Sequence, residues 1–208
     1  VSRTLSFNKE TTTVKDVIAK ITAKYIVQDL YEWVLYFPDK QLFLDPDASL
    51  VSLDLKHMQQ LVFEKIPENK QILGMDPAKL PMAQDVNSLK VPLVLIELKK
   101  WLYQTSALSQ PRIFLKEGDP ARMRQLFNKL TFNHKIKVTE EDSYSVASMV
   151  LNFYLSLPRP VMYGVNCDLF ITDLVNKNIL TSLHEPQSSL FSWLLDLLIE
   201  LLRLQVKE

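Results

Sequence analysis

The chain has 208 residues, of which 47% are hydrophobic and 23% are charged, a composition typical of a soluble globular protein. Its 24 Lys and Arg residues equal its 24 Asp and Glu residues, so the charge balance gives no support to binding of nucleic acid. With three Gly residues and no GxGxxG or GxxxxGKS/T motif, the sequence also excludes a phosphate-cradling loop of the usual kind.

The first third of the chain alternates between strand and helix patterns. Residues 2–10 show the two-residue alternation of a strand. Residues 11–25 place apolar side chains at three- and four-residue steps, as a helix does, with a threonine ahead of them as the N-cap. Short strands are then predicted at residues 31–37, 40–45 and 57–66. The simplest fold that accounts for these predicted elements is a small sheet with one helix packed on it.

From residue 71 onward the pattern is helical and is punctuated by prolines. Gly74, Pro77 and Pro81 indicate a linker at its start. Apolar residues at helical spacing predict five helices, at residues 91–104, 119–130, 143–156, 166–177 and 188–206. The change of period predicts two domains, residues 1–71 and 72–208.

Residues that bind metals or form disulfides are few and scattered. Cys167 is the only cysteine, which rules out an internal disulfide and favours a reducing, cytoplasmic location. His57, His134 and His184 show no HxxH or HExxH spacing. We therefore expect no metal site and no cofactor. The apolar run at residues 190–204 is interrupted by charges and predicts a buried amphipathic helix, not a membrane span.

The sequence TTTVKDVI at residues 11–18 resembles the TTVxDVI pattern of Ras-association domains. The resemblance implies an α+β ubiquitin-like roll whose first strand lies ahead of Val1. Domains of this kind meet an acidic GTPase edge with basic side chains of the second strand and first helix. The positions that correspond here are Arg3, Lys9, Lys20 and Lys24. The alternative is an ordinary solvated helix face, whose charges Glu10 and Asp16 balance.

Three segments of the second half, in order, resemble the RhoGAP domain. KVPLVLIELKKWL resembles the opening helix of that family, RIFLKEGDPARMRQLFNKL its IFRxSG segment and the helix after it, and SVASMVLNFYLSLPRPVM its VAxxLKxYLRxLPxPL helix. The resemblance covers about residues 72–208. It implies an all-α, RhoGAP-like helical domain whose final helix lies beyond Glu208. The predicted fold is thus an α+β ubiquitin-like roll followed by an all-α domain.

In RhoGAP domains the arginine of IFRxSG enters the GTPase site and neutralises charge on the transferred phosphoryl group. The matching position here is Leu115, which has neither charge nor hydrogen-bond donor. The family lysine of the later helix corresponds to Leu151 and the following arginine to Leu155. Arg112 is separated from Leu115 by Ile113-Phe114 and is expected to point elsewhere. The resemblance therefore implies a RhoGAP scaffold without its catalytic arginine.

These positions lead to the expectation that the chain is not an enzyme and that GTPase-activating activity is absent. It would be a non-catalytic interaction module in small-GTPase signalling or membrane traffic. Two alternatives stay open: an active domain that uses a displaced arginine, Arg112 or Arg122, and a purely structural module of a larger protein. The expected partner is a small GTPase of the Rho or Ras superfamily or another signalling protein, and the expected location is cytoplasmic, with recruitment to membranes through partners.

Overall fold

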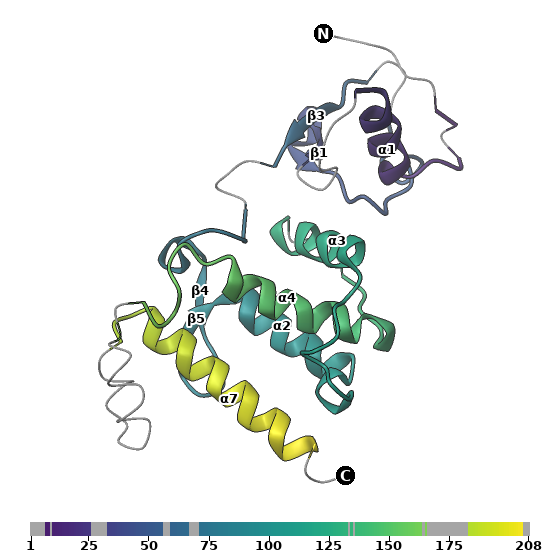
Figure 1. Cartoon of the computed structure of the whole chain (residues 1–208). Helices are drawn as coiled ribbons and strands as arrows, with labels where there is room; N and C mark the ends of the chain where they lie inside the picture. Colours follow the sequence, from purple (N-terminus) through teal and green to yellow (C-terminus); the bar gives the residue numbers. More distant parts are fainter. Residues whose placement is uncertain are drawn as a thin grey trace. The chain divides into compact units, whose positions relative to one another are not determined.

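The computed structural model describes residues 7–8, 10–25, 33–55, 59–66, 71–132, 134, 136–163, 165 and 183–205. By packing, the chain divides into two units (Figure 1). Unit 1 comprises Val1–Gln71 with Arg124–Ile136, and unit 2 comprises Ile72–Met123 with Lys137–Glu208. Whether residues 1–71 and 72–208 are separate domains stays a prediction.

Unit 1 contains the helix α1 (Val14–Tyr25), which begins at a capping box. The Thr13 N–H donates to Asp16 Oδ2 at 2.8 Å, and the Asp16 N–H donates to Thr13 Oγ1 at 3.3 Å. The hydrogen bond from the Thr13 backbone holds the pKa of Asp16 below its ordinary value. The predicted threonine cap is therefore confirmed, and it sets the start of the helix.

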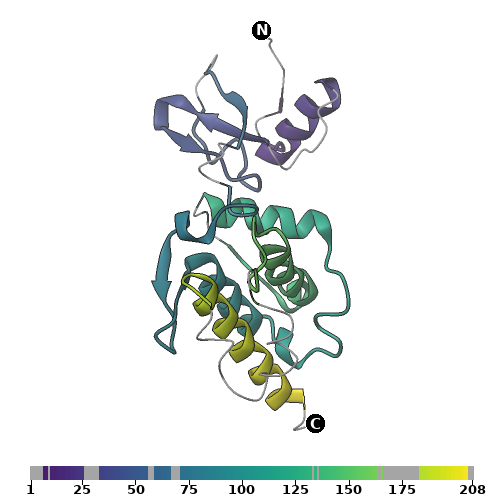
Figure 2. The same cartoon turned by 60° about the vertical axis from the view of Figure 1, so that its left-hand side comes forward.

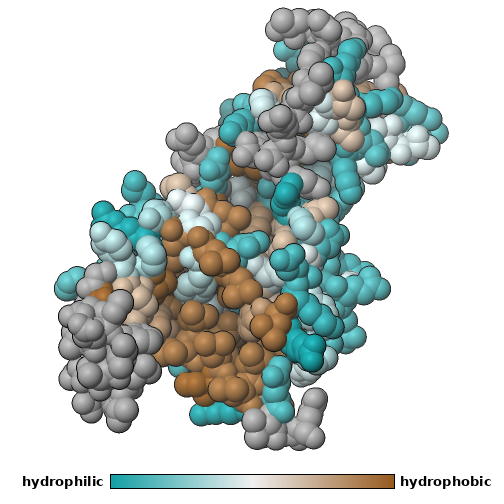
Figure 3. Space-filling view, viewed as in Figure 1, coloured by the Kyte–Doolittle hydropathy of each residue, from teal (hydrophilic) through white to brown (hydrophobic). Residues whose placement is uncertain are grey.

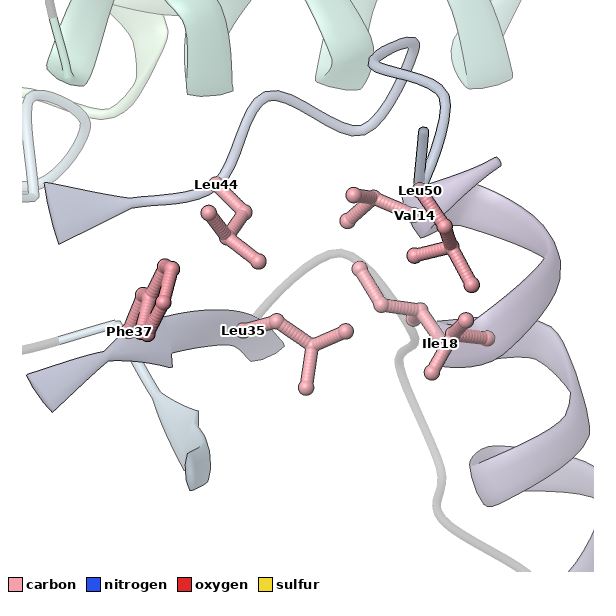
Figure 4. Packing of buried hydrophobic residues seen from close by; sticks show 7 residues of the cluster. Val14, Ile18, Leu35, Phe37, Leu44 and Leu50 are labelled. Atoms are coloured by element: carbon pink, nitrogen blue, oxygen red, sulfur yellow. The ribbon is translucent and has the colours of Figure 1, made fainter. Parts of the chain in front are cut away.

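The strands of unit 1 form an antiparallel sheet of order β2-β1-β3, with β1 at Trp33–Phe37, β2 at Leu42–Phe43 and β3 at Val62–Lys65. Figure 4 shows α1 and β1 side chains converging on one core. Its buried members are Val14, Val17, Ile18, Leu35, Phe37, Leu44 and Leu50. One helix on a small sheet was predicted from the sequence and is observed. A complete ubiquitin-like roll stays a prediction.

The second half of the helix α3 (Pro120–Thr131) packs within unit 1. The ammonium group of Lys129, whose side chain is 9% exposed, lies 2.7 Å from Asp47 Oδ2 and 3.4 Å from Asp45 Oδ1. The Phe132 ring stacks on Phe43 with centroids 4.5 Å apart. A lysine this buried requires charged partners, and these contacts explain why residues 124–136 belong to unit 1. The sequence did not predict this grouping.

Unit 2 is built on the helices α2 (Leu93–Gln104), α4 (Ser143–Leu155) and α7 (Gln187–Gln205), which Figure 2 shows from a second side. Their core is formed by apolar side chains that include Leu95, Leu98, Leu102, Val146, Met149, Val150, Phe153, Leu190, Trp193 and Leu197. The helices predicted at residues 91–104, 119–130, 143–156 and 188–206 are confirmed to within two residues. The helix predicted at residues 166–177 lies outside the described residues.

An all-α second half was predicted, and this needs correction. The strands β4 (Met82–Gln84) and β5 (Lys90–Pro92) pair antiparallel in unit 2. The Asp85 side chain closes the hairpin, since its Oδ1 accepts from the N–H of Asn87 at 3.0 Å and of Leu89 at 2.8 Å. The predicted linker residues Gly74, Pro77 and Pro81 come before this hairpin in the chain. The helix α2 begins after the hairpin, at Leu93.

The outer face of α7 is apolar. Figure 3 shows a broad hydrophobic area over the part of unit 2 where α7 lies in Figure 1. Its exposed side chains include Leu195, Leu198, Ile199 and Leu202. On the inner side, the Lys99 ammonium group of α2 pairs with Glu200 Oε1 at 2.8 Å. The prediction of a buried amphipathic helix is therefore wrong for this face, because apolar side chains of α7 are exposed on it while Leu190, Trp193 and Leu197 are buried.

Candidate functional site

The loop ahead of α3 contains a tight turn at residues 112–116. The Arg112 carbonyl accepts from the Leu115 N–H at 2.9 Å and from the Lys116 N–H at 3.2 Å. A turn closed in this way brings its first and fourth Cα atoms within about 7 Å of each other. Ile113 is buried, whereas Arg112, Leu115 and Lys116 are exposed. The turn therefore brings the backbones of Arg112 and Leu115 close together, although Ile113-Phe114 lies between them in the sequence. That the Arg112 side chain points elsewhere stays a prediction.

Arg112 adopts a left-handed backbone conformation with φ of 56°. For a residue with a Cβ atom this conformation costs on the order of 1 kcal/mol, and such residues are concentrated at functional sites. The turn is held in place by Tyr144 of α4, whose hydroxyl donates to the Pro111 carbonyl at 3.2 Å. The Lys116 ammonium group lies 5.0 Å from the centroid of the same ring. The strained turn is thus fixed against α4.

Gly118 fixes the other end of the loop. A Cβ atom at this position would lie 2.3 Å from Ser145 Cα, so only glycine permits this approach to α4. The Gly118 N–H donates to Ser148 Oγ at 2.9 Å, and the Asp119 N–H donates to Ser145 Oγ at 3.1 Å. Both serines are buried. Gly118, the glycine of the IFRxSG-like segment, is therefore the point at which the loop contacts α4.

The helix α3 starts directly after this docking point. Asp119 Oδ1 accepts from the Ala121 N–H at 2.9 Å, and the Asp119 carbonyl accepts from the Met123 N–H at 2.9 Å. Pro120 stands at the first helical position, where its missing N–H costs least. Cap and proline together set the direction in which the chain leaves the loop.

Arg122, the second displaced-arginine candidate, is held by an ion pair. Its Nε donates to Asp142 Oδ1 at 2.7 Å and its Nη2 to Asp142 Oδ2 at 3.0 Å, with a further bond to the Lys137 carbonyl at 3.0 Å. Burial raises the pKa of Asp142, but the Arg122 and Thr139 hydrogen bonds outweigh burial and hold this pKa below its ordinary value. Arg122 therefore has a structural role, in which it binds Asp142 and the Lys137 carbonyl.

The two leucines of α4 lie on the helix stripe where the loop docks. Tyr144, Ser148, Leu151 and Leu155 follow one another at steps of four, three and four residues, which places them on one side of the helix. Leu155 is 82% exposed and Leu151 is 37% exposed, while Leu115 in the loop is 82% exposed. Leu151 and Leu155 are therefore exposed on one side of α4, and Leu115 is exposed in the loop.

Of the predicted basic rim, Lys20 and Lys24 are exposed on α1, and the Lys20 ammonium group lies 4.9 Å from the centroid of the Phe7 ring. Arg3 and Lys9 lie outside the described residues. A partner-binding role for these four residues stays a prediction.

Within the described ranges, no three His, Cys, Asp or Glu side chains are grouped so that they could hold a metal ion. Cys167 and His57 are outside these ranges, and His134 contacts the Phe43 carbonyl through Nε2 at 2.9 Å. None of the helices that the structure describes combines the length and hydropathy of a membrane span.

Sequence reasoning missed the residues of α4 that anchor the loop, Tyr144, Ser145 and Ser148. A signal was present, because small serines at positions 145 and 148 lie three residues apart among apolar residues of the predicted helix. Small side chains inside a buried helix indicate that backbone approaches closely there.

Comparison with known proteins gives a family match over this part of the chain. The RhoGAP domain family matches residues 92–205. The Rho GTPase-activating protein gacA of Dictyostelium discoideum is 28% identical over 131 residues, which are 62% of this chain and 38% of the relative. The chain thus spans less than two fifths of the length of that curated relative. No solved structure gives a significant match.

These matches correct one expectation from the sequence. A chain without GTPase-activating activity was expected from Leu115, Leu151 and Leu155, whereas the family and the relative are both those of GTPase-activating proteins. The error came from weighing these three positions above the match of the whole segment, residues 92–205. Since the family matches more than half of its residues, the chain belongs to the RhoGAP domain family.

Proposed function

We propose that this chain promotes GTP hydrolysis by a Rho-family GTPase and that Arg112 supplies the guanidinium group. The observation that carries the proposal is the turn at residues 112–116, which presents Arg112 at the surface beside Leu115. Family membership and the name of the relative support the partner class.

The chemistry requires a cation that reaches the transferred phosphoryl group. Guanidinium is planar, permanently charged and able to bond two phosphate oxygens at once. An arginine of this kind raises the rate of hydrolysis by about 10³ to 10⁵. Leu115 has no such group, and Lys116 contacts the Tyr144 ring and hydroxyl. Arg112 is the arginine of this turn.

Arg122 is the weaker alternative because of its ion pair. If its guanidinium left Asp142, a carboxylate whose side chain is 9% exposed would lose its main counter-charge. Uncompensated buried charges cost several kcal/mol. Arg112, by contrast, is exposed and would have no such pair to break.

A single-turnover hydrolysis assay with a panel of Rho-family GTPases tests the proposal. The wild-type chain should accelerate hydrolysis at least about a hundredfold over the intrinsic rate, equivalent to about 2.7 kcal/mol of barrier. Arg112→Ala should abolish most of this acceleration. Arg203→Ala, which removes an exposed arginine on α7, is the matched control and should keep it. Full activity of Arg112→Ala would refute the role of Arg112.

A second candidate function is recruitment, in which binding of the GTPase carries the signal. The exposure of Leu115 and Leu155 favours it, because these side chains offer contact area and no charge. The same panel separates the two candidates. Binding of the GTPase without a change in its hydrolysis rate would favour recruitment, and acceleration that depends on Arg112 would favour the first proposal.

For unit 1 we propose a ubiquitin-like, Ras-association-like domain whose Lys20 and Lys24 face an acidic partner edge. Their exposure on α1 supports this proposal. Limited proteolysis between residues 67 and 90 tests whether residues 1–71 and 72–208 are separate domains, since uniform resistance would indicate one fused body. The proposed partner is a cytoplasmic protein, which agrees with the expected location.

A further inference from the structure

Tyr144 of α4 contacts both sides of the turn at residues 112–116. Its hydroxyl donates to the carbonyl of Pro111, the residue immediately before Arg112, at 3.2 Å. The Lys116 ammonium group donates to the same hydroxyl oxygen at 3.4 Å and lies 5.0 Å from the centroid of the ring. One side chain therefore holds the residue that precedes the turn and the residue that ends it.

The contact with Pro111 acts on Arg112 through the backbone. The Pro111 carbonyl and the Arg112 N–H belong to one peptide plane. A bond that fixes this carbonyl therefore limits rotation about φ of Arg112, which has the left-handed value of 56°. A non-glycine residue keeps such a conformation only where its surroundings determine it. The Tyr144 hydroxyl supplies part of that determination.

The helix that carries Tyr144 is a rigid support. Ser145 and Val146, the next two residues of α4, are buried in unit 2. A side chain on a packed helix holds its partners more precisely than a side chain on a loop does. Orientation of a catalytic group contributes directly to the reaction rate, and small displacements of it are costly. The turn thus receives its orientation from the core of unit 2.

We infer that Tyr144 is a positioning residue for GTP hydrolysis. Its hydroxyl holds the peptide before Arg112 and its ring holds Lys116, so that the turn presents the Arg112 guanidinium group in one orientation. The inference rests on the proposed function, in which Arg112 supplies that group. Tyr144 acts through Arg112, so loss of its contacts should lower the maximal rate and leave the half-saturating concentration unchanged.

Two tyrosines of α4 provide the test, in single-turnover hydrolysis with a Rho-family GTPase at increasing concentrations of the chain. Tyr144→Phe should lower the maximal rate about fivefold, the factor that one hydrogen bond contributes. Tyr154→Phe removes a bond of the same kind, from the Tyr154 hydroxyl to the Leu190 carbonyl at 2.9 Å. It is the matched control and should leave the maximal rate within about twofold of wild type.

Urea denaturation separates positioning from support of the fold. The Tyr154 bond is partly buried and the Tyr144 bond is exposed, so Tyr154→Phe should be at least as destabilising as Tyr144→Phe. The order of the effects on stability is then the reverse of the order of the effects on the maximal rate. A purely structural role of Tyr144 would give the same order in both measurements.

Lys116 tests the part played by the ring. Lys116→Met keeps a long unbranched side chain and removes the charge, and it should lower the maximal rate about threefold. Lys116→Arg keeps a cation over the Tyr144 ring and should retain the wild-type rate. A maximal rate that Lys116→Met leaves unchanged would overturn the role of the ring.

Amide hydrogen exchange gives a readout that needs no GTPase. The N–H groups of Leu115 and Lys116 are bonded to the Arg112 carbonyl, and their exchange should be about fivefold faster in Tyr144→Phe and unchanged in Tyr154→Phe. Acceleration by the wild-type chain that Tyr144→Phe does not reduce would overturn this inference and leave the proposed function intact. Absence of acceleration by the wild-type chain would overturn both.

Discussion

The two ends of the segment 112–122 differ in how they are held. At its start, Arg112 and Leu115 are exposed in a turn that is closed by its own backbone. At its end, Gly118 is bound to α4 and Arg122 is bound to Asp142. An arginine in this segment is therefore available to a partner only when the fold does not already hold its guanidinium group, and this distinguishes Arg112 from Arg122.

The anchored end makes the exposed end possible. A left-handed residue such as Arg112 persists only where the surrounding structure fixes the turn. Here Tyr144 binds Pro111 on one side of the turn and Ser148 binds Gly118 on the other. The following predictions alter one end or the other and measure whether the two respond differently.

Gly118→Ala should have the largest effect on stability. Its Cβ would meet backbone atoms of Ser145, which cannot rotate away as a side chain can, and we expect a loss of about 3 kcal/mol in the free energy of unfolding. Urea denaturation measures this loss. Gly74→Ala is the matched control: Gly74 has φ of 77° but an open surrounding, so only the conformational cost of about 1 kcal/mol should appear. Equal losses would mean that the loop is not closely docked on α4.

Arg122→Ala should have the next largest effect. It leaves Asp142 without its main counter-charge, and because Arg122 is partly exposed we expect about 2 kcal/mol of destabilisation instead of the full cost of a buried pair. Arg112→Ala should change the free energy of unfolding by less than about 0.5 kcal/mol in the same measurement. If Arg112→Ala is the more destabilising of the two, Arg112 has a structural role and the proposed difference between Arg112 and Arg122 is wrong.

The contribution of the Arg122–Asp142 pair should depend on pH. The pKa of Asp142 is lower in the folded state than in the unfolded state, so its stabilising effect is present above the unfolded value of about 3.9 and is lost as pH falls through the folded value. The difference in unfolding free energy between wild type and Asp142→Asn should be full near about pH 7 and shrink below about pH 4. A difference that grows on acidification would contradict this assignment.

The smallest effect on stability is expected at the exposed lysines of unit 1. Lys20→Glu combined with Lys24→Glu should leave the melting temperature nearly unchanged, because both side chains are exposed. If the basic rim faces a GTPase, association should slow at low salt, and this difference should vanish at high salt. Stopped-flow kinetics at two ionic strengths measures it. An unaffected association rate would leave the rim as an ordinary solvated face.

The helices were predictable from the sequence because their apolar side chains recur at a regular helical spacing. The helices α1, α2, α4 and α7 each follow from apolar side chains at helical spacing. The β4-β5 hairpin was missed because three-residue strands give too short an alternation, and its Asp85 turn contains no glycine. The grouping of residues 124–136 with unit 1 depends on Lys129 meeting Asp45 and Asp47, a contact between residues far apart in sequence.

The candidate site was predictable in its positions and not in its geometry. Motif spacing located Leu115, Leu151 and Arg112. It did not predict that a turn brings Arg112 beside Leu115, because this depends on the left-handed conformation of a non-glycine residue. Nor did it separate Arg112 from Arg122, since only the folded chain brings Asp142 to Arg122.

The most direct test separates the maximal rate of hydrolysis from the concentration that gives half of it. GTP hydrolysis by a Rho-family GTPase is measured in single turnover at increasing concentrations of the wild-type chain, of Arg112→Ala and of the control Arg203→Ala. We predict that Arg112→Ala lowers the maximal rate at least about a hundredfold with little change in the half-saturating concentration. Arg203→Ala, which removes an exposed arginine of α7, should leave both the maximal rate and the half-saturating concentration unchanged. A maximal rate that is insensitive to Arg112→Ala would contradict the central claim.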